Sequence, residues 1–370
     1  MKVVIAPDSF KGSISAERAA AVISRSVKAI HPNAKVVLKP MADGGEGTLD
    51  ALLAATDGEK VPFICRGPLG ETRESFYLKL RDGTAVIEGA EISGLPLVPE
   101  AMRNPDNTTS YGIGEAISHA VGNGATSILI GLGGSSSNDG GLGMLQALGV
   151  KAFDEAGIEL PAAGSSLLHV SSLDFSKINP GLKGVKIRVA CDVDNPLTGQ
   201  RGATAVYGPQ KGATPEQILR YDEAMNRYGN LVEASTGSKL MVTPGAGAAG
   251  GLGFALLSIG ASLVSGAELI ADAIGLENVI AGADLVITGE GQSDEQTLYG
   301  KAPGQVANIA STHRVPVVLI SGSLAGDLTK LNEQFTACFS IIPGVMPLEE
   351  CMRRAEELLY DTASQVMRLV

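Results

Sequence analysis

The chain has 370 residues, and at roughly 150 residues per domain this length indicates more than one domain. It carries 29 Lys plus Arg against 40 Asp plus Glu, a formal charge of −11, so the basic surface that nucleic-acid binding needs is not expected. Because 44% of the residues are hydrophobic and only 19% are charged, the chain can bury ample cores, which excludes wholesale disorder.

The predicted elements near both chain ends are apolar strands that alternate with longer helical patterns. This alternation is typical of a parallel α/β domain. A helix is predicted over 16–30 and another after Gly44. The predicted strands of this kind are 3–6, 36–38, 285–288, 315–321 and 339–342.

The middle of the chain has a different pattern. Short apolar runs at 63–65, 74–80 and 85–88 are separated by Gly-Pro and Asp-Gly turns, as in an antiparallel meander. We therefore expect an α/β fold of two domains with the active site in the cleft between them. Residues 1–62 and 280–370 would form a Rossmann-like α/β/α domain, and residues 63–279 an inserted mixed α/β domain.

One charge-free stretch, residues 240–267, is long enough to span a bilayer. It contains Pro244 and seven glycines, five of them between Gly245 and Gly253. This composition favours a glycine-rich loop that runs into a buried helix, so no membrane association is expected.

The cysteines and the N-terminus both indicate a cytoplasmic protein. Cys65, Cys191, Cys338 and Cys351 form no CxxC pair and no metal-finger spacing, which is typical of free thiols in a reducing compartment. The N-terminal apolar run ends at Asp8 and is too short for the hydrophobic region of a signal peptide.

Glycine accounts for 47 residues, and much of it lies in loops that also carry acids, lysines or hydroxyls. Glycine lets backbone amides turn toward phosphate oxygens, and loops at the carboxyl ends of strands are where open α/β sheets bind ligands. These loops favour a phosphate-handling enzyme over a plain binding module. They are residues 8–12, 43–47, 131–143, 191–202, 208–212, 245–253 and 289–294.

Common nucleotide motifs do not fit these loops. Gly300-Lys301 lacks the upstream glycine and the following hydroxyl of a Walker loop. Residues 245–250 spell GxGxxG, but Pro244 makes the preceding segment a poor strand. The run 131–137 is similar to the phosphate loop of the galactokinase and homoserine kinase superfamily, which stays a rival interpretation.

Two pairs of acids have both a structural and a chemical interpretation. Asp43 and Glu46 form a capping box, a feature that is often only structural. Asp192 and Asp194 follow the apolar run 185–190; in a continuing strand they would share a face and could meet one Mg²⁺, whereas the alternative is a solvated acidic turn.

Two lysines and the histidines complete the candidates. Lys11 and Lys211 are each followed by glycine in a short loop, as phosphate-contacting lysines often are, although ordinary surface lysines share this pattern. The four histidines lie apart in the sequence, so neither a serine-histidine-acid triad nor a histidine metal cluster is suggested.

Seven strings, in order along essentially the whole chain, resemble the bacterial glycerate kinases of the class that yields 2-phosphoglycerate from D-glycerate and ATP. One departure is Gly89, where the family pattern has methionine. The strings are APDSFKG (6–12), ADGGEGT (42–48), GLGGS (131–135) with NDGG (138–141), CDVDNPL (191–197), GPQKGA (208–213), the glycine-rich run 244–253, and TGEG (288–291) with Asp294.

The resemblance implies a two-domain kinase, unrelated to Walker-loop kinases, that uses ATP and Mg²⁺. Placing physical roles on the matching motifs, we expect Lys11 to bind an anion and Asp43 to accept the hydroxyl proton. Asp192 and Glu290 are further catalytic candidates, and Asp192 and Asp194 are the expected metal ligands, with Glu290 as a third choice. The remaining substrate-binding or phosphate-binding candidates are Asp8, Ser9, Gly44, Gly45, Glu46, Gly133, Gly134, Ser135, Lys211, Gly247 and Asp294.

Other functions stay open on the sequence. They are a phosphotransferase acting on another small hydroxy or sugar acid, a phosphatase or isomerase of phosphorylated sugar acids, and a non-catalytic nucleotide-binding protein. ATP consumption that depends on glycerate distinguishes these. The expected partners are glycerate and ATP, with neither nucleic acid nor membrane, and a homodimer is a candidate assembly.

Overall fold

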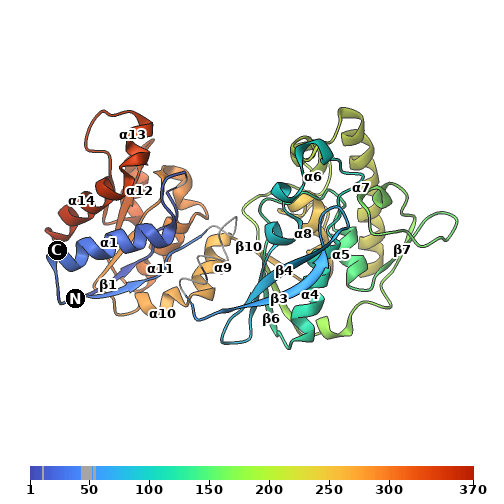
Figure 1. Ribbon diagram of the computed structural model, residues 1–370, viewed down its shortest axis with the longest axis horizontal. Helices are drawn as coiled ribbons and strands as arrows, with labels where there is room; N and C mark the ends of the chain where they lie inside the picture. The colour runs from blue at the N-terminus through green and yellow to red at the C-terminus, as the bar shows by residue number, and fades with distance from the viewer. Residues whose placement is uncertain (11, 43–51, 53–55) are drawn as a thin grey trace. The chain divides into compact units, whose positions relative to one another are not determined.

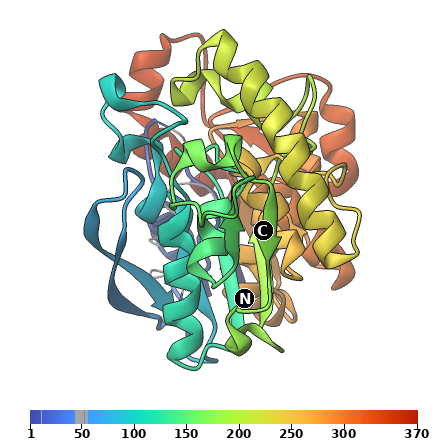
Figure 2. The same ribbon diagram turned by 90° about the vertical axis from the view of Figure 1, so that its right-hand side faces the viewer.

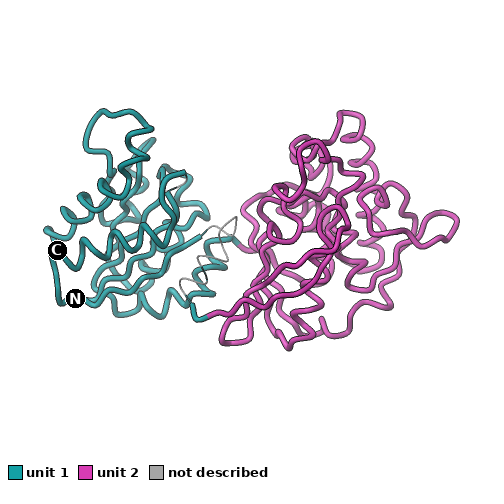
Figure 3. The backbone as a smooth tube through the Cα atoms, viewed as in Figure 1, with its two compact units in different colours: residues 1–43, 50–57, 265–370 teal, residues 44–49, 58–264 magenta. Residues whose placement is uncertain are grey.

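A computed structural model describes the chain except residues 11, 43–51 and 53–55. The described residues form two compact units (Figure 3): those of 1–43, 50–57 and 265–370 are unit 1, and those of 58–264 are unit 2. The unit boundaries near 58 and 265 precede the expected domain boundaries near 63 and 280. β3 already begins at Glu59, and the helices that follow residue 265 pack against α11 of unit 1.

Unit 1, in which Figure 1 labels β1, contains a five-stranded parallel sheet in the order β15-β13-β11-β1-β2. All residues of β11 and β13 are buried, as expected for parallel strands that are covered on both faces. Pairing of Val3 with Leu285 joins the N-terminal strand to the C-terminal part of the chain in one sheet. The strands are β1 Lys2–Ile5, β2 Lys35–Leu38, β11 Leu285–Thr288, β13 Val317–Ser321 and β15 Ala337–Ser340.

The helices of unit 1 cover this sheet. α1 packs against α14, and together with Val3, Ile5 and Ile287 they form one hydrophobic cluster. α11 contacts β11 and β13. The bounds are α1 Ala16–Ile30, α9 Gly266–Ala273, α10 Leu276–Ile280, α11 Ala302–Thr312, α12 Leu328–Gln334, α13 Leu348–Arg353 and α14 Ala355–Met367, with η6 Glu295–Leu298 and the short strands β12 Gln292–Ser293 and β14 Ser323–Leu324.

Unit 2 contains a six-stranded mixed sheet in the order β10-β9-β6-β5-β4-β3. β3, β4 and β5 are antiparallel, which confirms the predicted meander, whereas β5, β6, β9 and β10 are parallel. The strands are β3 Glu59–Arg66, β4 Thr72–Lys79, β5 Ala85–Glu88, β6 Ser127–Gly131, β9 Lys186–Ala190 and β10 Ser262–Val264; β7 Lys151–Phe153 and β8 Ser172–Asp174 form a separate pair.

The longest helix of unit 2 is α7, which is yellow-green in Figure 2. Thr214 and Gln217 form a capping box at its start. The helices are α3 Gly89–Ser93, α4 Tyr111–Gly122, α5 Leu142–Ala147, α6 Ala203–Tyr207, α7 Pro215–Thr236 and α8 Ala248–Ser258, with the 3-10 turns η1 Leu95–Leu97, η2 Glu100–Met102, η3 Gly164–Leu168, η4 Pro180–Leu182 and η5 Pro209–Lys211.

The charge-free stretch 240–267 contains α8, whose Leu252, Phe254 and Ala255 are buried in the core of unit 2. The expected glycine-rich loop and buried helix are thus confirmed. Among the described residues no helix combines the length and the hydropathy needed to cross a bilayer. The α/β class is also confirmed, with a parallel sheet from the chain ends and a mixed sheet from the middle.

One predicted strand is displaced in the structure, and one predicted helix is not tested by it. The strand predicted at 339–342 is β15 at Ala337–Ser340, because it pairs with β13 only as far as Ser321 opposite Ser340. Ile341 and Ile342 therefore follow the strand. The helix predicted after Gly44 falls mainly on residues outside those described.

Candidate active site

Unit 1 holds a pocket of about 680 Å³ whose lining includes the loops that follow β1, β11 and β13. Counted within this unit, the strand order is 2-1-3-4-5, and the chain direction across the sheet reverses between β1 and β11. Ligands of open α/β sheets bind outside the carboxyl ends of the strands at such a switch point. The loops after β1 and β11 bring Asp8 and Ser9 into the same pocket as Glu290 and Asp294.

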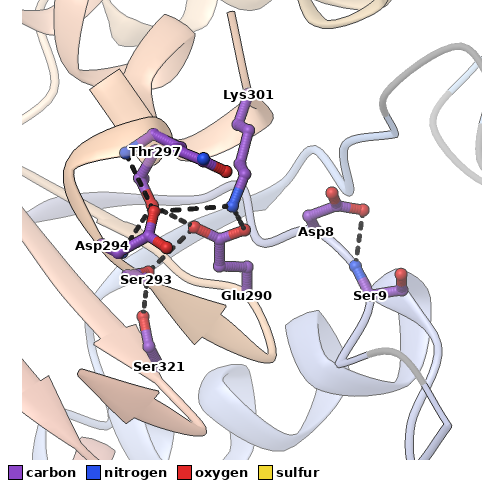
Figure 4. Close-up of polar contacts among 9 residues, drawn as sticks. Asp8, Ser9, Glu290, Ser293, Asp294, Thr297, Lys301 and Ser321 are labelled. Carbon is purple, nitrogen blue, oxygen red and sulfur yellow. Dashed lines mark hydrogen bonds and ion pairs between the residues drawn. The ribbon is translucent and has the colours of Figure 1, made fainter. Parts of the chain in front are cut away.

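Hydroxyl groups hold the carboxylate of Glu290 inside this pocket (Figure 4). Its Oε1 accepts hydrogen bonds from Thr297 Oγ1 at 2.6 Å and from Ser293 Oγ at 2.9 Å. Ser321 Oγ lies 2.6 Å from Ser293 Oγ and extends this network. Oε2 faces Lys301, whose Nζ is 3.6 Å away. One carboxylate oxygen is therefore fixed by the protein, and the other lies beside a cation.

The neighbouring acids make this end of the pocket negative. Asp294 accepts from the backbone N–H of Gln296 at 2.9 Å, and its Oδ1 is 4.0 Å from Lys301 Nζ. Asp8 Oδ1 accepts from the N–H of Ser9 at 2.6 Å. Three carboxylates against one ammonium give the described residues of the pocket lining a formal charge of −2. A cation or a hydrogen-bond donor fits such an end better than a bare anion.

Lys301 is a site residue that the sequence analysis did not identify. It is the N-cap residue of α11 and lines the pocket with a side chain that is 38% exposed. The signal in the sequence is a Gly-Lys pair in a loop before a helix, a pattern that fails as a Walker motif. Lys301 can pair with Glu290 and Asp294 without being part of a Walker motif.

Lys211 of unit 2 is buried, which excludes the alternative of an ordinary surface lysine. Its exposed fraction is 2%, and Nζ donates to Ser135 Oγ at 2.9 Å and to the carbonyl oxygen of Ser137 at 2.6 Å. Burial lowers the pKa of Lys211 to about 7, an effect that the charge of Asp139 opposes only in part. The loops 131–143 and 208–212 are thus joined by a lysine ammonium.

Asp139 organises the same loop from inside unit 2. Its carboxylate accepts from both the N–H and the hydroxyl of Ser110 at 2.8 Å, and from the N–H groups of Gly141 at 3.0 Å and Gly143 at 3.3 Å. These bonds connect the starts of α4 and α5. The sequence analysis gave Asp139 no role, although an acid before two glycines and a helix is a capping signal.

The glycine loop 245–253 packs directly against loop 131–143. Gly250 has a φ of +70°, and a Cβ atom there would lie 2.2 Å from the carbonyl oxygen of Ser137, so a side chain does not fit. The N–H of Gly140 donates to the Gly250 carbonyl at 3.0 Å. Gly247 similarly donates to the carbonyl of Asn195 at 2.8 Å. Four of the predicted loops therefore meet in unit 2.

The strand argument for a metal at Asp192 and Asp194 is wrong. β9 ends at Ala190, because its partners Gly131 of β6 and Val264 of β10 are the last residues of their strands. Both acids therefore lie in a loop. Asp194 is largely exposed and accepts two hydrogen bonds from Arg201 Nη2, at 2.7 and 2.8 Å, which lower its pKa.

Within the described ranges, no group of three or more His, Cys, Asp or Glu side chains could hold a metal ion. The chemistry of the acids nevertheless fits Mg²⁺, which proteins often bind through one or two carboxylates together with substrate phosphates. The candidates Lys11, Asp43, Gly44, Gly45 and Glu46 lie outside the described residues. The roles of all candidates, and a common cleft for the loops of both units, stay predictions.

Comparisons with known proteins identify relatives of this chain. Residues 3–370 match the model of the glycerate kinase family. The glycerate kinase of Bacillus subtilis (strain 168) is 46% identical over 369 residues, which are 99% of this chain and 97% of that protein. The glycerate 2-kinase of Escherichia coli (strain K12) is 45% identical over 371 residues, 100% of this chain and 96% of that protein. A crystal structure assigned as glycerate kinase 2 from Salmonella typhimurium LT2 has a TM-score of 0.89 at 46% identity, covering 100% of this chain and 98% of that chain.

Proposed function

Because this chain belongs to the glycerate kinase family over residues 3–370 and is therefore a kinase, we propose that it transfers the γ-phosphoryl group of ATP to the 2-hydroxyl of D-glycerate. The observation that carries the proposal is the 45% identity, across 100% of the chain, to a relative named glycerate 2-kinase. The pocket in unit 1 supports it, because buried and ordered polar groups lie at a sheet edge where ligands bind.

The proposed roles follow from the demands of phosphoryl transfer, in which positioning and charge neutralisation matter most. Lys11 binds an anionic group of the substrates, and Asp43 accepts the proton of the attacking hydroxyl. Bound Mg²⁺ would supply positive charge to the phosphate oxygens. Asp192, Asp194 and Glu290 are the carboxylates proposed to hold it; of these, Glu290 has a hydroxyl-anchored oxygen and lines a pocket.

The remaining substrate contacts are proposed for Asp8, Ser9 and Asp294 in unit 1, and for Gly133, Gly134, Ser135 and Gly247 in unit 2. Lys211 needs a revised role, because its ammonium already donates to loop 131–143 from a buried position. We propose that it holds Ser135 in place and does not itself meet the phosphates. Gly44, Gly45 and Glu46 are proposed as part of the same loop as Asp43.

The test is an assay of ADP release with D-glycerate, L-glycerate and no acceptor, followed by phosphorus NMR of the product. A phosphate ester on the 2-carbon couples to a single proton and gives a doublet, whereas an ester on the 3-carbon couples to two protons and gives a triplet. We expect turnover that requires D-glycerate and Mg²⁺, and a doublet. ADP release that is independent of glycerate would refute the proposed function, and a triplet would refute only its regiochemistry.

We also propose that the protein is cytoplasmic and forms a homodimer. The four cysteines are free thiols in the structure, which supports a reducing compartment. Sedimentation equilibrium at micromolar concentration tests this assembly. A species of twice the monomer mass is expected, and a single species of monomer mass would refute the dimer.

A further inference from the structure

The pocket of unit 1 is lined by apolar side chains as well as by acids. Ile341 and Ile342 follow β15, Leu348 and Met352 lie on α13, and Phe10 follows β1. Two of these side chains are open to solvent although they are large and hydrophobic: Leu348 is 72% exposed and Met352 is 37% exposed. Exposed apolar side chains that line a pocket are typical of a ligand site.

The N-terminal loop and α13 are fitted closely to each other at this apolar side. Gly12 has a φ of +80°, and a Cβ atom there would lie 2.9 Å from Met352 Cε. Phe10 is 2% exposed and is therefore fixed in the core beneath the loop. Phe10 is thus buried beneath the apolar side of the pocket, whereas Leu348 and Met352 form its solvent-exposed rim.

Size and charge argue that glycerate is not the occupant of this pocket. A volume of about 680 Å³ lies in the range that holds drug-sized ligands, whereas glycerate is a small acid without an apolar part. Without an accompanying cation, its carboxylate would face three carboxylates and a single ammonium among the described lining residues.

An adenine nucleotide carried by Mg²⁺ satisfies both sides of the pocket. Its flat, weakly polar base needs apolar contacts, and the metal that accompanies its phosphates needs carboxylate oxygens. The pocket also lies at the switch point of a sheet with strand order 2-1-3-4-5, where such folds bind nucleotide-like ligands.

We infer that the pocket of unit 1 binds the nucleotide, with the base against Ile342, Leu348 and Met352 and the phosphates toward Glu290 and Asp294. This inference rests on the proposed function for the identity of the nucleotide as ATP. It assigns the base to the C-terminal segment of the chain, so glycerate must bind elsewhere.

The test places a carboxylate on the apolar rim with Leu348→Asp and Met352→Asp. Both positions are exposed, so folding should be retained. Val345→Asp is the matched control, because Val345 is fully exposed in the same segment and does not line the pocket. Calorimetry measures binding of Mg²⁺ with a non-hydrolysable ATP analogue and, separately, of Mg²⁺ with inorganic triphosphate, both without glycerate.

We expect each rim variant to bind the ATP analogue at least tenfold more weakly than the Val345→Asp control, with a matching rise in KM for ATP. Triphosphate binding and the KM for glycerate should stay within twofold of the control. If the control and the rim variants bind the analogue with equal affinity, the inference is wrong. Turnover of glycerate by the wild type would still support the proposed function in that case. If the rim variants bind the analogue more weakly but the wild type does not turn over glycerate, the inference stands and the proposed function is refuted.

Discussion

Replacing Lys211 with methionine should change how the stability of the protein depends on pH. Lys211 is buried and its pKa is about 7, whereas an unfolded lysine has the ordinary value of 10.5. At 1.36 kcal/mol per pH unit, this difference means that protonation of Lys211 destabilises the folded state by about 5 kcal/mol at low pH. Methionine is similar in length and does not ionise.

The sign follows from proton counting. Below pH 7 both states carry the proton, and above pH 10.5 neither does. Between these values the unfolded chain binds more protons than the folded one, so the stability contributed by Lys211 rises with pH. From pH 7 to pH 9, the free energy of unfolding of the wild type should therefore gain about 2 kcal/mol relative to Lys211→Met.

The assay is urea unfolding at pH 7, 8 and 9, followed by near-ultraviolet circular dichroism. Tyr221 and Tyr228 are fully buried in unit 2 and report on its packing, since the chain has no tryptophan. Lys183→Met is the control, because Lys183 is exposed in the same unit and its replacement should leave the pH dependence unchanged. A constant difference between wild type and Lys211→Met would show that the lysine titrates normally.

Three further predictions concern the loops. Asp43→Asn should lower kcat with little change in stability, since asparagine caps a helix nearly as well as aspartate; full kcat at saturating substrates would leave Asp43 as a cap only. Asp192→Asn should lower turnover by orders of magnitude at every Mg²⁺ concentration, and near-normal rates would remove it from the essential ligands. Gly250→Ala should destabilise the protein by about 1–3 kcal/mol more than Gly260→Ala in thermal unfolding, because both glycines have positive φ but only Gly250 faces a backbone carbonyl; equal losses would mean that the Ser137 carbonyl yields freely.

The sequence predicts strands whose bounds depend on local composition, but it does not predict where a distant neighbour ends a strand. Strand 285–288 was predicted with its observed bounds, because an apolar run between polar loops depends only on local composition. The end of β9 was not predictable, since it is set by where β6 and β10 stop, and those strands lie far away in the chain. Asp192 and Asp194 were therefore assigned to a strand that does not reach them.

Partners from distant segments limited the prediction of site residues in the same way. The polar loop around Lys211 gave no sign that its ammonium would be buried under Ser135. Lys301 was passed over because its role depends on Glu290, which is held by hydroxyls of other loops. Local patterns identify loops that can carry chemistry, but tertiary packing decides which side chain is available.

The pairing of β1 with β11 has a consequence for biosynthesis. β1 lies inside its sheet between the edge strand β2 and β11, but its partner on one side begins at Leu285. A ribosome that adds roughly 5–20 residues per second therefore exposes this N-terminal strand for on the order of ten seconds or more before its neighbour exists. Unit 2 is continuous from residue 58 to 264 and leaves the ribosome in the meantime. The apolar residues of β1 must be kept from aggregation throughout that interval, because one edge of the strand has no partner until β11 has been synthesised.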